Sequence, residues 1–420
     1  MTTTLQDCRA MDQNDPLRKL RDLFVLPEGV VYLDGNSLGP LPKATAARVA
    51  AAVEQEWGQG LIRSWNTAGW FEMPRRVGDR IGAWIGAREG EVVATDTTSI
   101  NLYKVLSAAT RIASADAPGR KVVLSERSNF PTDLYIAQAL CEERGWSLRL
   151  VDAGQLESEL RTGDVAVLML THVNYRTGSM HDMAGLTALA HRHGTLAIWD
   201  LAHSAGAVPV DLHAAGADFA IGCGYKYLNG GPGSPAFAWV HPRHADRFWQ
   251  PLAGWWGHAA PFEFTPEYRP APGIARYLCG TQPVLSMVAL DCGLDAIDAA
   301  RPLGGMQALR AKSLALTDLF IALVEQRCDG QGLSLVTPRE HGRRGSQVCL
   351  ARAEGAFAIV QALIARGVIG DFRAPDILRF GFTPLYLEYE DVWKAVEQLR
   401  QVLETGEWRR PEFNRQQAVT

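Results

Sequence analysis

The chain has 420 residues, of which 47% are hydrophobic and 21% are charged, with a formal net charge of −4 and a pI near 6.2. This length exceeds one ordinary hydrophobic core, so two or three packed units are expected. The small negative charge argues against a nucleic-acid partner and gives no reason to expect binding to a membrane surface.

The cysteines and the N-terminus indicate the cellular compartment. The seven cysteines are scattered, odd in number and without CxxC spacing, which is typical of reduced thiols in a cytoplasm. The first 20 residues have neither the basic start nor the continuous apolar stretch of a secretory signal. We therefore expect a cytoplasmic protein.

The first 50 residues are predicted to form an irregular arm. Residues 30–33 are a strand candidate, and the turn-rich residues 34–40 follow it. Pro42 suits the first turn of a helix that extends to about Trp57. The turn-rich segment fits either a purely structural turn or a substrate-lining loop, and both interpretations stay open.

From Glu91 the pattern changes to strands that alternate with helices. Short apolar runs predict strands at residues 92–94, 121–125, 147–151, 164–169, 196–199 and 219–222. Apolar periodicity predicts helices at residues 100–112, 131–144 and 182–193. The alternation implies right-handed crossovers and an α/β fold, in which a mostly parallel sheet is flanked by helices on both faces.

The C-terminal part reads differently. After Gly254 comes a long loop rich in Trp, Gly and Pro, typical of a binding loop or a subunit contact. Further elements, which predict a smaller α+β unit, are expected at residues 285–299, 305–327, 347–351, 355–366, 377–382 and 391–403. We predict an N-terminal arm (1–50) that is part of the small domain, a large domain (51–285) and a small C-terminal domain (286–420).

Polar and aromatic residues follow several predicted strands. Thr171 and Asp200 lie just past two of them, and Phe130 lies beyond a third. In such sheets ligands bind beyond the carboxyl ends of the strands. Hydroxyl side chains occupy four of the five positions 95–99, at the start of a helix. They fit simple N-capping or phosphate binding by the free N–H groups of the helix.

Asp200 and Lys226 carry the main chemical signal. They lie 26 positions apart, each after a buried-looking strand, and are accompanied by His203 and Tyr225. A lysine near the protein interior is costly unless it is paired or covalently bonded, and it can hold an aldehyde cofactor as a Schiff base. An aspartate beside a pyridine nitrogen keeps that ring protonated, so that the ring acts as an electron sink. A solvated surface lysine and a structural histidine are the alternatives.

Longer strings around these residues resemble the kynureninases, a pyridoxal-phosphate family of the fold-type-I, class V aminotransferase superfamily. They are WDLAHSAG at residues 199–206 and GYKYLNGGPG at residues 224–233. The same resemblance covers DGNSLG (34–39), SNFPTD (128–133), HVNYRTG (172–178), LAGWWGH (252–258) and RFGFTPLY (379–386). The Asp–His–Lys part is shared across the superfamily, whereas the last two strings are more specific.

The resemblance implies a seven-stranded fold-type-I sheet and pyridoxal 5'-phosphate as the cofactor. Lys226 would hold the cofactor as a Schiff base, and Asp200 would pair with its ring nitrogen. The other implied contacts are Phe130 stacked on the ring, Asp133 at its phenolic side, Thr171 and His203 beside it, and Thr98, Ser99 and Tyr225 at the phosphate. Trp255 and Thr281 would complete the phosphate site from the partner subunit, which implies a homodimer with its site at the subunit interface.

The resemblance also implies a reaction, the hydrolytic cleavage of L-kynurenine to anthranilate and L-alanine. This reaction belongs to tryptophan catabolism by the kynurenine pathway and is linked to NAD biosynthesis. Lys226 would be the base at Cα, and Tyr225 would assist proton transfer later. Arg379 would bind the substrate's α-carboxylate, a task suited to guanidinium, with Arg373 on a predicted loop as the competing candidate.

Trp65, His258 and Gly280 are the candidates for the aryl pocket. Gly280 offers no side-chain donor to a ring hydroxyl, so we expect kynurenine to be preferred over 3-hydroxykynurenine. A cysteine desulfurase, an aminotransferase and a non-catalytic cofactor-binding protein are the alternatives. A desulfurase needs a mobile nucleophilic cysteine, whereas Cys349 lies in a predicted strand and Cys328 closes a predicted helix.

Overall fold

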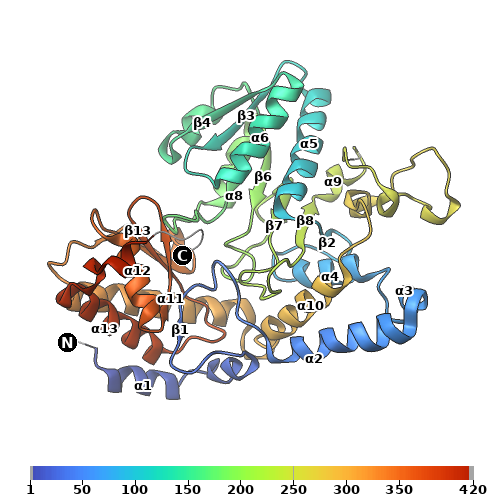
Figure 1. Ribbon diagram of the computed structural model, residues 1–420. Helices are drawn as coiled ribbons and strands as arrows, with labels where there is room; N and C mark the ends of the chain where they lie inside the picture. Colours follow the sequence, from blue (N-terminus) through green and yellow to red (C-terminus); the bar gives the residue numbers. More distant parts are fainter. Residues whose placement is uncertain (1–2, 249, 416–420) are drawn as a thin grey trace.

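A seven-stranded sheet forms the centre of the computed structural model, which describes residues 3–248 and 250–415 (Figure 1). Its strand order is β2-β8-β7-β6-β5-β3-β4. The strands are β2 (Val92–Thr95), β3 (Val122–Glu126), β4 (Ser147–Val151), β5 (Val165–Thr171), β6 (Leu196–Asp200), β7 (Phe219–Gly222) and β8 (Ala236–Val240). Strands β3 to β7 pair in parallel, and β8 runs antiparallel to both β2 and β7. The mostly parallel, seven-stranded sheet is confirmed.

Helices cover both faces of this sheet, and its strands are therefore buried on both sides. In β6, consecutive residues Ile198 and Trp199 belong to hydrophobic clusters on opposite faces, as the pleat requires. The helices of this part are α4 (Met73–Gly82), α5 (Thr98–Asp116), α6 (Pro131–Arg144), α7 (Leu156–Leu160), α8 (Met183–Arg192) and α9 (Pro242–Ala245). Among the described residues, no helix combines the length and the apolar character needed to cross a bilayer.

The C-terminal part builds a second, smaller sheet. Its four antiparallel strands, in the order β12-β13-β10-β9, are β9 (Ser334–Leu335), β10 (Gln347–Ala351), β12 (Asp371–Arg373) and β13 (Ile377–Gly381). The helices of this part are α10 (Val284–Asp298), α11 (Gly305–Arg327), α12 (Ala356–Ala365) and α13 (Tyr389–Thr405). Helices α11 and α13 contact each other and α12 contacts β13, which gives the α+β unit that the sequence predicts.

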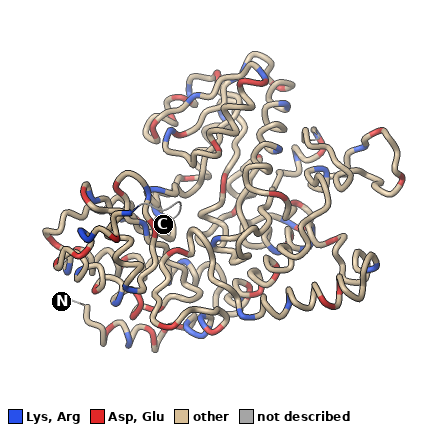
Figure 2. Tube along the Cα trace, viewed as in Figure 1, with Lys and Arg blue, Asp and Glu red and all other residues tan. Residues whose placement is uncertain are grey.

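The N-terminus lies against this C-terminal unit. Helix α1 (Leu5–Gln13) contacts α13, and β1 (Val31–Tyr32) pairs in parallel with β11 (Val368–Ile369). Ion pairs Arg9–Glu390 at 3.1 Å and Arg18–Glu388 at 2.9 Å join the two segments. Figure 2 accordingly shows acidic and basic residues interspersed over this end of the molecule.

Four local predictions were wrong or incomplete. The arm predicted to be irregular contains α1. This helix begins with a capping box formed by Thr4 and Asp7. The helix predicted to end near Trp57 is α2 (Lys43–Ala51), which continues as π-helix over Ala52–Gly60; the short α3 (Ser64–Thr67), which carries Trp65, follows. Strand β8 was not predicted, and Arg373 ends strand β12 instead of lying on a loop.

Candidate active site

A cavity of about 320 Å³ lies at the carboxyl ends of β5 and β6. All nine residues predicted to contact the cofactor from within one chain line it, namely Thr98, Ser99, Phe130, Asp133, Thr171, Asp200, His203, Tyr225 and Lys226. It is also lined by Thr97, which belongs to the hydroxyl cluster at positions 95–99, and by Thr132, Tyr175 and Ala202, for which the sequence predicts no role in binding. The residues that follow different strands therefore meet in one place, while the role of each stays a prediction.

Lys226 and His203 contact each other in this cavity. Lys226 lies in the turn after β7, and its Nζ is 3.0 Å from Nε2 of His203. His203 is buried, and burial together with the positive charge of Lys226 lowers its pKa well below the usual value. A neutral imidazole accepts a hydrogen bond from the amine, so His203 can orient Lys226 without carrying a competing charge.

Two buried carboxyl groups, Asp200 and Asp133, lie beside the lysine. Thr171 and Asp200 are paired residues of β5 and β6, and Asp133 lies in the first turn of α6. The backbone N–H of Ala202 donates to Asp200 Oδ1 at 2.8 Å. Burial raises the pKa of Asp200, although Lys226 opposes the rise, and burial with the charge of Asp200 raises the pKa of Asp133 well above its usual range. Two carboxyl groups so placed favour a further cationic or N–H partner.

The cofactor that the sequence resemblance implies fits these groups. A protonated pyridine nitrogen would give Asp200 a charged N–H donor. At another side of the cavity Thr98 and Ser99 begin α5 behind the N-cap Thr97, and the first N–H groups of a helix suit a phosphate. Phe130 is 40% exposed and meets the ring of Tyr175 edge-on at 5.2 Å between centroids, so part of its ring can stack on a ligand.

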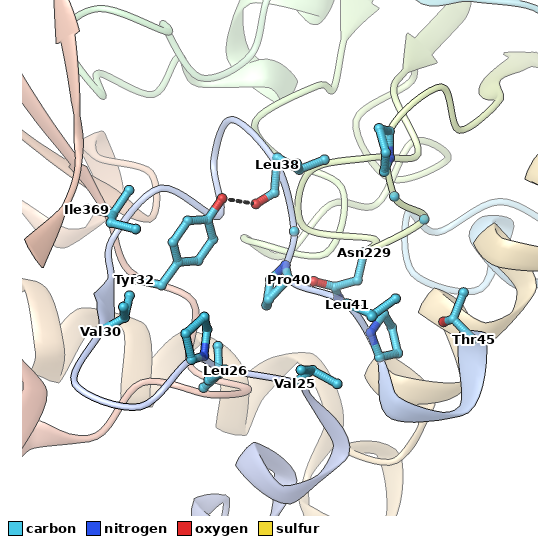
Figure 3. Close-up of a pocket in the computed structure, with 16 residues that line it drawn as sticks. Val25, Leu26, Val30, Tyr32, Leu38, Pro40, Leu41, Thr45, Asn229 and Ile369 are labelled. Atoms are coloured by element: carbon cyan, nitrogen blue, oxygen red, sulfur yellow. Dashed lines mark hydrogen bonds between the residues drawn. The ribbon is translucent and has the colours of Figure 1, made fainter. Parts of the chain in front are cut away.

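The turn that carries Lys226 contacts the N-terminal arm. The N–H of Gly39 donates to the carbonyl of Tyr225 at 2.8 Å, and a Cβ on Gly39 would lie 2.5 Å from the carbonyl oxygen of Lys226. Figure 3 shows a cavity between the arm and residues 229–232, which follow Lys226, with Tyr32 and Leu38 on its wall. The cavity has a volume of about 300 Å³ and is mostly apolar, and Tyr32 donates to the carbonyl of Leu38 at 2.7 Å. Position 39 therefore requires glycine, because backbone touches backbone there.

Arg379 lies behind the cavity wall, on β13, and is only 1% exposed. Its Nε donates to Oδ1 of Asp371 at 2.7 Å, and its Nη2 donates to the same carboxylate and to Ser37 Oγ, the latter at 2.7 Å. Its Nη1 donates to the carbonyl of Tyr175 at 2.9 Å. Arg379 thus reaches the cavity through Tyr175 but does not line the cavity itself.

The remaining predicted residues lie in another region of the chain. Trp65 packs on Trp256 at 5.2 Å between ring centroids, and His258 Nε2 is 3.2 Å from the carbonyl oxygen of Glu267. The predicted residues of this region, none of which lines the Lys226 cavity of the same chain, are Trp65, Trp255, His258, Gly280 and Thr281. The resemblance implies that Trp255 and Thr281 reach this cavity from a partner subunit.

Comparisons with known proteins show the family of this chain. A family profile described as the kynureninase C-terminal domain matches residues 309–399. A kynureninase from Pseudomonas fluorescens is 58% identical over 420 residues, which is 100% of both chains. A kynureninase from Burkholderia pseudomallei is 59% identical over 419 residues, which is 99% of this chain and 100% of that one. The chain belongs to the kynureninase family.

Solved structures share the fold of this family member at low sequence identity. A cysteine desulfurase from Thermococcus onnurineus NA1 has a TM-score of 0.77 and 17% identity, and the match covers 92% of this chain and 98% of that one. A mutant of C-DES with glycine covalently linked to its PLP cofactor has a TM-score of 0.78 and 17% identity, with 90% and 98% covered. At this low identity the likeness is one of fold. Cys328 and Cys349, the two candidates for the nucleophile of a desulfurase, are both buried here, and Cys349 lies within β10.

Proposed function

We propose that this protein uses pyridoxal 5'-phosphate to cleave L-kynurenine with water, giving anthranilate and L-alanine. The observation that carries the proposal is the position of Lys226, which meets His203 and the buried Asp200 in one cavity, in a chain that matches kynureninases over its full length. With this substrate the enzyme acts in tryptophan catabolism.

The residues around Lys226 divide the work at Cα of the substrate. The bound cofactor supplies an electron sink for the bonds at that carbon. Lys226 would hold the cofactor and would move the proton at Cα of the substrate. His203 accepts a hydrogen bond from the lysine amine and so orients it, and Asp200 would keep the ring nitrogen of the cofactor protonated. Phe130 would contact the face of the ring, and Asp133 and Thr171 would line its edge.

Tyr225 serves the later, hydrolytic stage. It lines the cavity next to Lys226, and burial raises its pKa above the usual value of a phenol. Tyr225 therefore stays protonated at neutral pH and can give a proton when the Cβ–Cγ bond breaks. The same phenol, with Thr98 and Ser99, donates hydrogen bonds at the phosphate end of the site. Arg379 belongs to the anchor of the substrate's α-carboxylate.

A homodimer with shared active sites completes the proposal. Residues 255–264 carry a cluster of exposed rings in the loop that projects from the body in Figure 1. Trp255, Phe262 and Phe264, which contact one another, are 41%, 61% and 74% exposed, and such a patch marks a binding surface. In the dimer, Trp255 and Thr281 would reach the partner's phosphate site, and Trp65, His258 and Gly280 its aryl pocket. With glycine at 280, kynurenine is preferred over 3-hydroxykynurenine.

We also propose the division into an arm (1–50) that is part of the small domain, a large domain (51–285) and a small domain (286–420). The contacts of α1 and β1 with the C-terminal unit support the first part of it. A cytoplasmic location and a link to NAD biosynthesis complete the proposal.

Kynurenine turnover tests the function directly. The protein loaded with the cofactor should consume kynurenine and release fluorescent anthranilate without an added keto acid. Lys226→Ala should abolish both turnover and covalent retention of the cofactor, whereas Lys19→Ala, at an exposed lysine of the arm, should change neither. A requirement for a keto acid would indicate an aminotransferase, release of sulfide from cysteine a desulfurase, and no turnover a binding protein.

A further inference from the structure

A buried lysine, Lys104, lies in helix α5 outside the Lys226 cavity and is 0% exposed. Its Nζ donates to the carboxylate of Asp96 and to the carbonyl of Tyr277, the latter at 2.6 Å. These two partners lie far apart in the sequence. Well-packed apolar side chains can replace a buried ion pair at little or no cost in stability. Packing alone therefore does not explain a lysine at this position.

Asp96 forms the turn that leads from β2 into α5. It directly precedes residues 97–99, which line the cavity and begin the helix. Its φ is 46°, a left-handed conformation that persists in residues other than glycine when their neighbours hold it. Lys104 and the hydroxyl of Thr95 both donate to Oδ2 of Asp96, the hydroxyl at 2.9 Å. Lys104 therefore holds the turn from which the phosphate end of the cavity starts.

The same ion pair neutralises a negative charge beside the predicted phosphate site. A phosphate bound by the first N–H groups of α5 lies at the end of the helix that Asp96 precedes. The carboxylate of Asp96 would repel this anion if no cation balanced it. Loss of the charge of Lys104 should therefore weaken the binding of a phosphate group there.

Tyr277 connects Lys104 to the residues predicted to serve the partner subunit. It ends a short 3-10 helix, and Thr281 follows four residues later. Between them, the carbonyl of Cys279 accepts from the N–H of Trp256 at 2.9 Å, so the segments that carry Trp255 and Thr281 are joined through their backbones. Lys104 holds one end of this pair of segments through the carbonyl of Tyr277.

We propose that Lys104 links the two active sites of the dimer, because it positions both the phosphate-binding start of α5 and the segments that give Trp255 and Thr281 to the partner. Each site then depends on two copies of Lys104. The copy in the subunit that holds the cofactor acts through Asp96, and the copy in the partner acts through Tyr277. Lys104 is a positioning residue, since it does not line the cavity. This inference rests on the proposed function, in which two subunits share each phosphate site.

Lys104→Met tests the proposal because methionine is similar in length but has neither the charge nor the N–H donors. Pyridoxal 5'-phosphate is titrated into the apoenzyme, and the absorbance of the bound cofactor is followed. The Kd should rise by about 10-fold or more, the scale of hydrogen bonds that involve charged groups, and Lys104→Arg should recover part of the loss. If Lys104→Met does not fold, Lys104→Gln takes its place. A Kd within twofold of the wild-type value would overturn the proposal.

Lys312→Met is the matched control. Lys312 is also a buried lysine, 5% exposed, and it pairs with Asp15 at 2.7 Å, but this pair joins the N-terminal arm to α11. The control should lower the Tm and leave the Kd for the cofactor within twofold of the wild-type value. An increase in Kd equal to that of Lys104→Met would show a general effect of losing a buried ion pair and would overturn the proposal.

Hybrid dimers separate the two routes of action. Two differently tagged chains are produced together, and dimers with both tags are purified. One chain carries Lys226→Ala, so that a single site keeps its lysine. Lys104→Met is placed either on the chain that keeps Lys226 or on the chain that lacks it. The affinity of the remaining site for the cofactor should fall in both hybrids, relative to the hybrid with Lys226→Ala alone. A loss in only one hybrid, or in neither, would refute the link between the sites.

Failure of the proposed function gives a different result. A wild-type dimer that binds the cofactor but does not consume kynurenine refutes the proposed reaction, and the titrations still decide the role of Lys104 because they need no kynurenine. A wild-type protein that does not bind the cofactor, or that is a monomer in solution, overturns both proposals.

Discussion

Replacing Asp34 by asparagine should stabilise the protein more at alkaline pH than at acidic pH. Asp34 is largely buried near Asp371, Arg373 and Arg379, and its pKa is raised from 3.8 to about 7 by burial and by the charge of Asp371. A carboxyl whose pKa is higher in the folded than in the unfolded chain favours folding at low pH. That contribution is lost as the pH rises from about 4 to about 7. Asparagine has no charge to bury at any pH.

The size of the effect follows from the pKa. A rise of about three pKa units corresponds to about 4 kcal/mol, at about 1.4 kcal/mol per unit. Rearrangement of the neighbouring arginines reduces this to about 2–4 kcal/mol. With an unfolding entropy of about 2.1 cal/mol/K per residue over 420 residues, the expected gain in Tm is about 2–4 °C.

Thermal unfolding at pH 5 and pH 8.5 measures this difference. The Tm of Asp34→Asn minus that of the wild type should be larger at pH 8.5, because at pH 5 most of the folded wild type carries a neutral Asp34. Asp329→Asn removes the same charge from an exposed position and should show no such dependence. An equal difference in Tm at both pH values would refute the raised pKa of Asp34.

Two further outcomes follow from contacts in other parts of the chain. Asp218→Asn should cost about 3–5 kcal/mol at pH 7, measured as a lower Tm, because buried Asp218 accepts from His191, His244 and Arg243. These bonds outweigh burial and hold the pKa of Asp218 well below its usual value, so the wild type should lose that advantage below about pH 4. Gly39→Ala should lower kcat and shift the absorbance of the bound cofactor, whereas Gly119→Ala, where a Cβ meets nothing within 4 Å, should not.

The convergence of the cofactor residues was predictable from the sequence for a physical reason. Parallel strands end at one edge of the sheet, so residues placed just after β5 and β6 must lie near each other even when the chain between them is long. Thr171 and Asp200 prove to be paired residues, and Lys226 follows β7, the next strand of the sheet. Tyr175 carried a weaker signal of the same kind, an aromatic residue shortly after a buried strand.

Other features leave no reliable trace in one sequence. Strand β8 is a short apolar run without a following long helix, and its antiparallel direction depends on its position in the sheet. The separation of His258 and Gly280 from the Lys226 cavity depends on how loops fold over one another. Helix α1 is different, because its capping box, with Thr4 and Asp7 three residues apart, can be recognised in the sequence.

The cluster of Arg379, Arg373 and Asp371 shows that residue type alone does not identify the partner of a charged side chain. An arginine on an apolar strand indicates an anionic partner, and the resemblance to the kynureninases implies that this partner is the substrate's α-carboxylate. The anionic partner in the structure is Asp371, which the register of β12 and β13 places opposite Arg379, and a register cannot be read from two short strands alone. What a guanidinium can still bind depends on how many of its N–H groups are already occupied. Arg379 has one N–H left on Nη1, whereas Nε and Nη1 of Arg373 have no acceptor among the described residues. This difference comes from the register of the small sheet, which residue type alone does not reveal.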